Sequence, residues 1–313
     1  MTLRPTFDDV IAADRRIAGF VKETPLIEAR IDDHQLWLKC ESLQEGGAFK
    51  LRGASNRLLR MDERERRRGV VAFSSGNHAQ GVAIAAERLR IPALIVMPSD
   101  APELKVAGTR RHGAEIVFYD RRTESREAIA ARIAAERGSI VVPSFDDPDI
   151  VAGQGTAGLE IVRQLGREPD LIVTPCGGGG LAAGLALACP SSRIAIAEPE
   201  RWDDMRRSLA LGDIVPVEAD APPTLCDALQ TPRVSPITFG ILQARNADAY
   251  AASEGEVATA VRWAFEKHNL TVEPGGAAAL ALVLAGKVEP VGETVVMLSG
   301  GNIDPALHAR LVG

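Results

Sequence analysis

The chain has 313 residues, of which 46% are hydrophobic and 25% are charged, as in an ordinary globular protein. Its net charge of -6 argues against nucleic acid or an anionic membrane as a partner. No segment approaches the roughly 20 uncharged apolar residues of a membrane span. The N-terminal residues also lack the apolar run of a signal peptide. We therefore expect a cytoplasmic protein with no membrane partner.

The cysteines and a cluster of arginines offer no site of their own. Cys40, Cys176, Cys189 and Cys226 are widely spaced and form no C-x-x-C pair, which argues against a structural zinc site and a disulfide framework. The arginines within residues 63–68 alternate with glutamates, a pattern typical of a solvated helix face rather than a phosphate-binding patch.

Apolar runs alternate with amphipathic segments along most of the chain. The patterns predict helices at 6–23, 49–60, 79–89, 102–112, 123–137 and 182–188, and strands at 36–40, 70–73, 93–97, 115–119, 139–142, 171–175, 193–197 and 294–298. Near-continuous apolar strands separated by helices are typical of parallel sheets buried on both faces. A break in composition at 143–148 indicates a crossover between two α/β lobes. Loops at the carboxyl ends of the strands would then border a small-molecule cleft.

Four consecutive glycines, Gly177, Gly178, Gly179 and Gly180, follow a predicted strand and precede Leu181 at the start of a helix. Such a run lets backbone N–H groups approach an anion closely, and the helix dipole adds favourable charge. The loop matches neither a Walker motif nor a dinucleotide fingerprint. A plain strand-to-helix turn needs only one or two glycines, so the run predicts a phosphate site.

Two further polar loops follow predicted strands. Ser74, Ser75, Gly76, Asn77 and His78 stand at a helix N-terminus, where a substrate carboxylate would be stabilised, although an ordinary capping loop has the same residue types.

The second of these loops is Ser299-Gly300-Gly301-Asn302.

Lys50 begins another helix after Ala48-Phe49, where the helix dipole and burial would lower its pKa and make it a better nucleophile. A lone lysine is otherwise most often a solvated one.

These segments together resemble a known family. ESLQEGGAFKLRGA (41–54), SSGNHAQG (74–81), GGGGL (177–181) and SGGN (299–302) occur in this order. The sequence resembles the fold-type II pyridoxal-phosphate enzymes, in the branch of the threonine/serine dehydratases and serine racemases. The resemblance implies an α/β fold with two open, mainly parallel twisted sheets flanked by helices, as in the tryptophan synthase β chain. It also implies a large cofactor-binding domain (1–64 and 147–313), a small domain (65–146) and a homodimer.

The same resemblance assigns roles to individual residues. Lys50 would bind pyridoxal 5'-phosphate covalently and later take the Cα proton, with Phe49 packed beside the cofactor ring. Asn77 would hydrogen-bond the cofactor's 3-hydroxyl, Gly177–Leu181 would hold its phosphate, and Ser299 would face the pyridine nitrogen. A neutral serine there weakens the ring as an electron sink, which favours elimination over transamination.

Two assignments concern the substrate. Ser75 occupies the position where the racemase branch keeps a second base, although a capping or carboxylate-binding hydroxyl would also fit. Arg126 resembles a position that reaches the active site, where it could pair with a substrate β-carboxylate and favour 3-hydroxyaspartate. A surface arginine paired with Glu127 is the alternative. In the family a glycine commonly follows the aspartate of an A-D-G motif, whereas Cys226-Asp227-Ala228 has alanine there, which leaves the substrate range open.

A cation site is also implied. The segment from Glu198 to Asp204 resembles one with which this branch binds Mg²⁺ or another divalent ion, through the Glu198 and Asp204 carboxylates and the Trp202 carbonyl. An acidic surface loop is the alternative.

The sequence thus predicts dehydration of a small hydroxy-amino acid, L-threonine or L-serine, to a 2-oxo acid and ammonia. The alternatives are a racemase of serine or another amino acid, a hydroxyaspartate dehydratase, and a non-catalytic protein that binds a phosphate ligand. The short tail after Asn302 leaves no room for a regulatory domain, so we expect a catabolic role.

Overall fold

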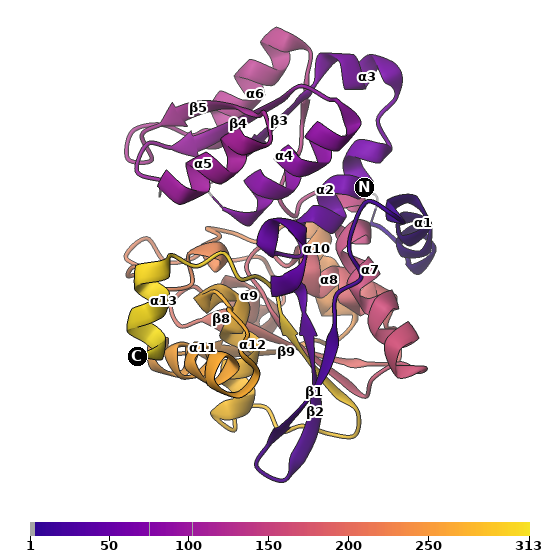
Figure 1. The fold of residues 1–313 in the computed structure, drawn as a ribbon, viewed down its shortest axis with the longest axis vertical. Coiled ribbons are helices and arrows are strands. Elements are labelled where there is room, and N and C mark those ends of the chain that lie inside the picture. Colours follow the sequence, from indigo (N-terminus) through magenta and orange to yellow (C-terminus); the bar gives the residue numbers. More distant parts are fainter. Residues whose placement is uncertain (1–3, 75, 102) are drawn as a thin grey trace.

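A computed structural model describes residues 4–74, 76–101 and 103–313, which form two lobes, each built around a sheet (Figure 1). The strands are β1 (Leu26–Ile31), β2 (His34–Cys40), β3 (Val70–Phe73), β4 (Ala93–Pro98), β5 (Glu115–Tyr119), β6 (Ile140–Val141), β7 (Leu171–Pro175), β8 (Arg193–Pro199), β9 (Asp248–Ala252) and β10 (Thr294–Leu298).

The helices lie between and around these strands. They are α1 (Phe7–Ile17), α2 (Lys50–Leu59), α3 (Glu63–Arg68), α4 (Asn77–Leu89), α5 (Glu103–Arg111), α6 (Arg126–Arg137), α7 (Pro148–Leu165), α8 (Gly180–Ala188), α9 (Asp204–Leu211), α10 (Pro236–Ala244), α11 (Glu254–His268), α12 (Pro274–Leu284) and α13 (Pro305–Val312), with short 3₁₀ turns η1 (Glu41–Leu43), η2 (Glu45–Gly47) and η3 (Asp227–Leu229).

The larger lobe contains a six-stranded sheet in the order β1-β2-β10-β7-β8-β9. Only the β1–β2 pair is antiparallel. One apolar cluster joins one face of this sheet to α11 and α12, and a second joins the other face to α1, α7, α8 and α10. A sheet covered on both faces has loops at its strand ends, and the loops after β7 and β10 form part of the site.

The smaller lobe contains a four-stranded parallel sheet in the order β5-β4-β3-β6, which lies at the top of Figure 1. It is built from residues 70–141, so the chain leaves the six-stranded sheet after β2 and returns to it at β7. Apolar clusters cover both of its faces. The predicted fold class, with two open and mainly parallel sheets flanked by helices, is confirmed.

The structure differs from the predicted elements at helix ends, at sheet edges and in six helices that the sequence patterns did not predict, α7 and α9 to α13. The helix expected over 6–23 ends at Ile17, because Ala18 leaves helical geometry (φ -53°, ψ 125°) and Gly19 has φ +79°. The edge strands β1 and β9 were not predicted. As expected, the arginine-rich segment is a short helix, α3, with no buried residue.

Helix α7 packs unusually closely against two other helices through glycines. A Cβ atom at Gly153 would lie 2.6 Å from the Cα of Gly53 on α2, and one at Gly155 would lie 2.7 Å from the carbonyl oxygen of Gly184 on α8. These contacts leave no space for a side chain, so α7 fixes the positions of both α2 and α8.

A buried ionic cluster surrounds Arg52 in the first turn of α2. The Arg52 guanidinium forms bidentate contacts of 2.6–2.8 Å with the carboxylates of Glu41 and Glu160, and Lys39 Nζ donates to Glu160 at 2.8 Å. All four side chains are at most 5% exposed. Because each charge is paired, the cluster locks the start of α2 without leaving an uncompensated buried ion.

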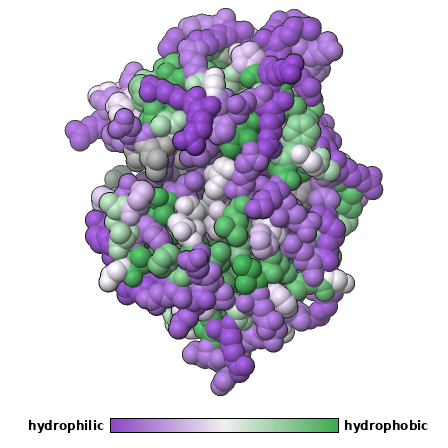
Figure 2. Space-filling model, in the orientation of Figure 1, coloured by the Kyte–Doolittle hydropathy of each residue, from purple (hydrophilic) through white to green (hydrophobic). Residues whose placement is uncertain are grey.

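Within the described residues, no helix is both long and apolar enough to cross a membrane. On the face shown in Figure 2, hydrophilic residues cover most of both lobes, and hydrophobic residues appear in patches among them.

Candidate active site

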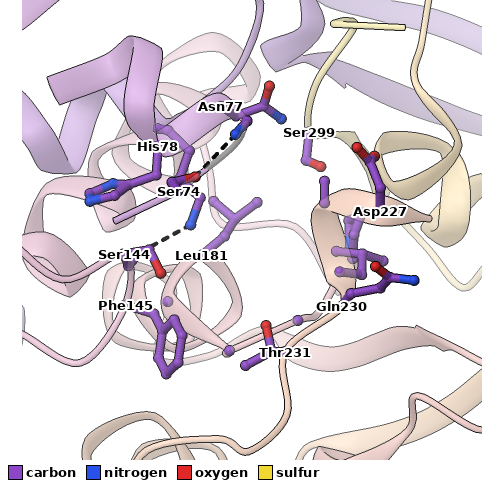
Figure 3. Close-up of a pocket in the computed structure, with 18 of the residues that line it drawn as sticks. Ser74, Asn77, His78, Ser144, Phe145, Leu181, Asp227, Gln230, Thr231 and Ser299 are labelled. Atoms are coloured by element: carbon purple, nitrogen blue, oxygen red, sulfur yellow. Dashed lines mark hydrogen bonds between the residues drawn. The ribbon is translucent and has the colours of Figure 1, made fainter. Parts of the chain in front are cut away.

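A cavity between the two lobes brings together the motifs singled out in the sequence. Its wall includes Phe49, Lys50, Ser74, Gly76, Asn77, His78, Arg126, Gly177, Gly178, Gly179, Gly180, Leu181 and Ser299. In Figure 3, Ser74, Asn77 and His78 lie on one side of the cavity, and Asp227, Gln230, Thr231 and Ser299 lie across from them. Ser75 lies outside the described residues, so its predicted role stays a prediction.

Lys50 is the first residue of α2 and faces this cavity. Its Nζ donates to the carbonyl of Ser144 at 3.0 Å and lies 5.0 Å from the centre of the Phe49 ring. Desolvation lowers the Lys50 pKa to about 8, although the negative charge of Glu273 acts in the opposite direction. The backbone N–H of Phe49 donates to the Ser299 carbonyl at 3.2 Å, which ties the start of α2 to the loop after β10.

The glycine loop runs from the end of β7 into the first turn of α8 and lines the same cavity as Lys50. Gly179 has φ +85°, and a Cβ there would lie 2.8 Å from Met205 Cε and 3.0 Å from Thr238 Cβ. A Cβ at Gly178 would lie 2.2 Å from the Phe145 ring. The loop therefore requires glycine for both its conformation and its packing, and it places a helix N-terminus at the cavity.

Asn77, the first residue of α4, joins the two lobes through its side-chain amide. Its Nδ2 donates to the Glu273 carboxylate, and its Oδ1 accepts from Asn302 Nδ2 at 2.8 Å. Glu273 and Asn302 belong to the larger lobe and Asn77 to the smaller one. Since one N–H of the Asn77 amide remains after these bonds, the amide can still donate to a molecule in the cavity.

The other residues of the same loop have defined positions. Ser74 Oγ accepts from the Gly76 N–H at 3.2 Å. His78 Nε2 contacts the Val142 carbonyl at 2.9 Å and therefore carries the proton, while Nδ1 has no partner in the described part of the chain. Burial and the charge of Lys50 lower the His78 pKa to about 3, so the imidazole is neutral.

Arg126 begins α6 and lines the cavity. Its guanidinium lies 5.6 Å from the centre of the Phe73 ring, while Nε donates to Glu127 Oε1 at 2.8 Å. The structure thus combines both sequence interpretations, since the arginine pairs with its neighbour and also borders the cavity.

Several lining residues were not assigned roles from the sequence, among them Lys105, Phe145, Asp227, Thr231 and Glu273. Burial, with the nearby charge of Asp227, raises the Glu273 pKa to about 7. Apart from Asp227, which precedes Ala228 in the motif described above, none of these residues belongs to a sequence motif, and each reaches the cavity only through the tertiary fold.

The predicted cation ligands are not among the described residues of the cavity wall. Glu198 accepts from the N–H groups of Met205 and Arg206 at 3.1 and 2.7 Å, and Asp204 accepts from the Val234 N–H at 2.9 Å. Burial raises the pKa of both carboxyls, that of Asp204 to about 7.

These two carboxylates are at most 1% exposed. The described residues contain no group of three or more His, Cys, Asp or Glu side chains arranged for a metal. Any cation between Glu198 and Asp204 would therefore need a carbonyl oxygen as well.

Comparison with known proteins identifies the family. Residues 17–300 match the family model for pyridoxal-phosphate dependent enzymes. The chain is 42% identical over 316 residues to an L-threo-3-hydroxyaspartate ammonia-lyase of Pseudomonas sp, with 98% of each protein covered. This chain is a pyridoxal-phosphate dependent enzyme.

Solved structures place the enzyme within a branch of that family. Maize serine racemase has a TM-score of 0.93 at 34% identity and covers 98% of this chain and 97% of its own. A threonine deaminase of T.th. has a TM-score of 0.88 at 42% identity, with 96% and 99% covered. The enzyme is therefore a fold-type II member of the branch that contains serine racemases, threonine dehydratases and hydroxyaspartate ammonia-lyases, as predicted. It is of the ammonia-lyase or dehydratase type.

The cavity fits this cofactor. Pyridoxal phosphate carries an aldehyde and a phosphate, and the wall offers both a lysine with a lowered pKa and a glycine loop at a helix N-terminus. Because a Cβ atom at Gly178 or Gly179 would clash with neighbouring atoms, this part of the loop accepts only glycine. When bound, the cofactor supplies an electron sink for breaking bonds at the substrate Cα.

Proposed function

We propose that the enzyme converts L-threo-3-hydroxyaspartate to oxaloacetate and ammonia. The observation that carries this proposal is the position of Arg126, which brings a guanidinium to the cavity wall shared with Lys50 and Asn77. A guanidinium recognises a second carboxylate, which hydroxyaspartate has and serine and threonine lack. The similarity to a hydroxyaspartate ammonia-lyase over 98% of the chain points the same way.

The residues of the cavity divide the work of such a reaction. Lys50 would hold the cofactor and take the Cα proton, and its lowered pKa keeps part of the amine neutral for that task. Asn77 would donate to the cofactor's 3-oxygen, the N–H groups of Gly177–Leu181 would hold its phosphate, and Ser299 would face its ring nitrogen. The N-terminus of α4 would bind the α-carboxylate through the loop that contains Ser74 and Gly76.

Release of 2-oxo acid from a panel of substrates tests this proposal. We expect kcat/KM for L-threo-3-hydroxyaspartate to exceed that for L-serine and L-threonine by about tenfold or more, the contribution of one charged hydrogen bond. A higher value for L-threonine or L-serine would instead support the dehydratase that the sequence first suggested. Loss of optical rotation without oxo acid would support a racemase, with Ser75 as the second base.

We also propose that Glu198, Asp204 and the Trp202 carbonyl bind a divalent cation such as Mg²⁺. Among the described residues, the two buried carboxylates accept hydrogen bonds only from main-chain N–H groups, and oxygen ligands suit a hard cation. Mg²⁺ at saturation should raise the melting temperature by roughly a few degrees through preferential binding to the folded state. The shift should disappear in Asp204→Asn and persist in Asp33→Asn, whose side chain is fully exposed. An equal shift in both variants would place the ion elsewhere.

The family also leads us to expect a homodimer, which light scattering of the purified enzyme would test.

A further inference from the structure

A pair of opposite charges joins the two lobes at the wall of the active-site cavity. Lys105, on α5 of the smaller lobe, donates through Nζ to the carboxylate of Asp227 in η3 of the larger lobe. The Lys105 side chain is 14% exposed and that of Asp227 is 49% exposed. Both line the cavity that contains Lys50, so the pair lies where a substrate must enter or bind.

Lys105 also lies next to the loop at the start of α4. A Cβ atom built on Gly76 would be 4.0 Å from Lys105 Nζ. A molecule whose α-carboxylate is bound at this helix N-terminus would therefore extend within reach of the Lys105 amine. Arg126 lines the same cavity, but its Nε is already occupied by the adjacent Glu127 at 2.8 Å.

The charges on the wall distinguish substrates with one carboxylate from those with two. Lys50, Lys105 and Arg126 are the cationic side chains of the described wall, and Asp227 and Glu273 are the acidic ones. Lys50 is reserved for the cofactor. A second substrate carboxylate near Asp227 would be repelled by it, unless the substrate took over the cation that Asp227 now holds.

We propose that Lys105 is a specificity-determining residue that binds the second carboxylate of a dicarboxylic hydroxy-amino acid. This substrate carboxylate replaces the Asp227 carboxylate as the partner of the Lys105 amine. This inference rests on the proposed function and deepens it. The exchange costs little because one charge-assisted pair replaces another, and the freed Asp227 carboxylate is half exposed to water. A monocarboxylic substrate has no group to exchange, so it leaves the pair in place.

The alternative is that the Lys105–Asp227 pair has only a structural role, as a clasp that links the two lobes. Two variants distinguish this role from substrate recognition. The measured quantity is the ratio of kcat/KM for L-threo-3-hydroxyaspartate to kcat/KM for L-serine. Lys105→Met should lower this ratio by about tenfold or more, because it removes the ligand of the second carboxylate. Asp227→Asn should raise the ratio several-fold, because it removes the competing anion.

A clasp would be broken equally by both variants, so their ratios would move together or stay unchanged, and either result would overturn the exchange. Arg126→Met, measured in parallel, identifies the other carboxylate ligand. If it alone lowers the ratio, Lys105 has no part in specificity. Should Lys105→Met fail to fold, Lys105→Gln takes its place, because it removes the same charge and should lower the ratio in the same way.

Calorimetric titration of the holoenzyme with non-reacting acids gives a second readout. Succinate and butyrate have the same carbon chain and differ by one carboxylate. Lys105→Met should reduce the preference for succinate over butyrate by about tenfold, and an unchanged preference would overturn the inference. If hydroxyaspartate proves not to be a substrate, the proposed function fails, while this titration still shows whether Lys105 recognises a second carboxylate.

Discussion

Replacing Lys50 with alanine is expected to reduce 2-oxo acid release by at least ~1,000-fold, because in the proposed mechanism this side chain would both attach the cofactor and move the Cα proton. The geometry supports both tasks, since the amine faces the cavity and desolvation lowers its pKa to about 8. The visible absorbance of the bound cofactor should change at the same time, because its covalent attachment is lost.

Lys267→Ala is the matched control, since Lys267 is an exposed lysine on α11. It should retain both the activity and the absorbance of the unaltered enzyme. Undiminished turnover in Lys50→Ala, with the cofactor still bound, would show that another group moves the proton and would contradict the assignment.

Replacing Gly179 with alanine should weaken pyridoxal-phosphate binding on the order of 100-fold. The residue has φ +85°, and a left-handed conformation costs a residue with a Cβ roughly 1–2 kcal/mol. The added methyl group would also meet Thr238 Cβ at 3.0 Å, and overpacking of this kind typically costs about 1–3 kcal/mol. The variant loop would relax away from this conformation, so cofactor binding would have to restore the strain.

Gly166→Ala is the control, because it introduces the strain of a left-handed residue without the overpacking. Gly166 ends α7 with φ +75°, but a Cβ there would have no atom within 4 Å. This variant should lose about 1 kcal/mol of stability and keep its cofactor affinity. Fluorescence titration of both cofactor-free variants with pyridoxal phosphate measures the difference. Equal affinities would mean that the glycine loop does not hold the phosphate.

The central strands of both sheets were predictable because burial on two faces imposes an unbroken apolar run. Leu171–Pro175 and Thr294–Leu298 were predicted with the bounds that the structure shows. The edge strand Asp248–Ala252 was not, because its residues are mostly half-buried and its sequence, DAYAA, lacks an apolar run. Pairing with β8 stabilises it, and that pairing is a tertiary effect.

The residues of the site also fall into those that the sequence predicts and those that only the tertiary fold brings together. The glycine loop, Lys50 and Asn77 belong to contiguous motifs in which neighbouring residues indicate the chemistry. Glu273 and Lys105 are single charged residues, and a single glutamate or lysine in a sequence is most often solvated. Only the packing of α12 and α5 against the cleft brings these two residues to the cavity wall.

The glycine contacts of α7 have a consequence for the size of the site. No part of α7 is among the described residues of the cavity wall, yet it sets the positions of α2, which carries Lys50, and α8, which begins at the glycine loop. The two ends of the proposed cofactor site are therefore positioned by the same helix. A larger residue at Gly153 or Gly155 would lengthen the site while leaving every chemical group in it unchanged. The distance between the Lys50 amine and the glycine loop is thus set by the packing of buried helices, and the residues of the site alone do not determine it.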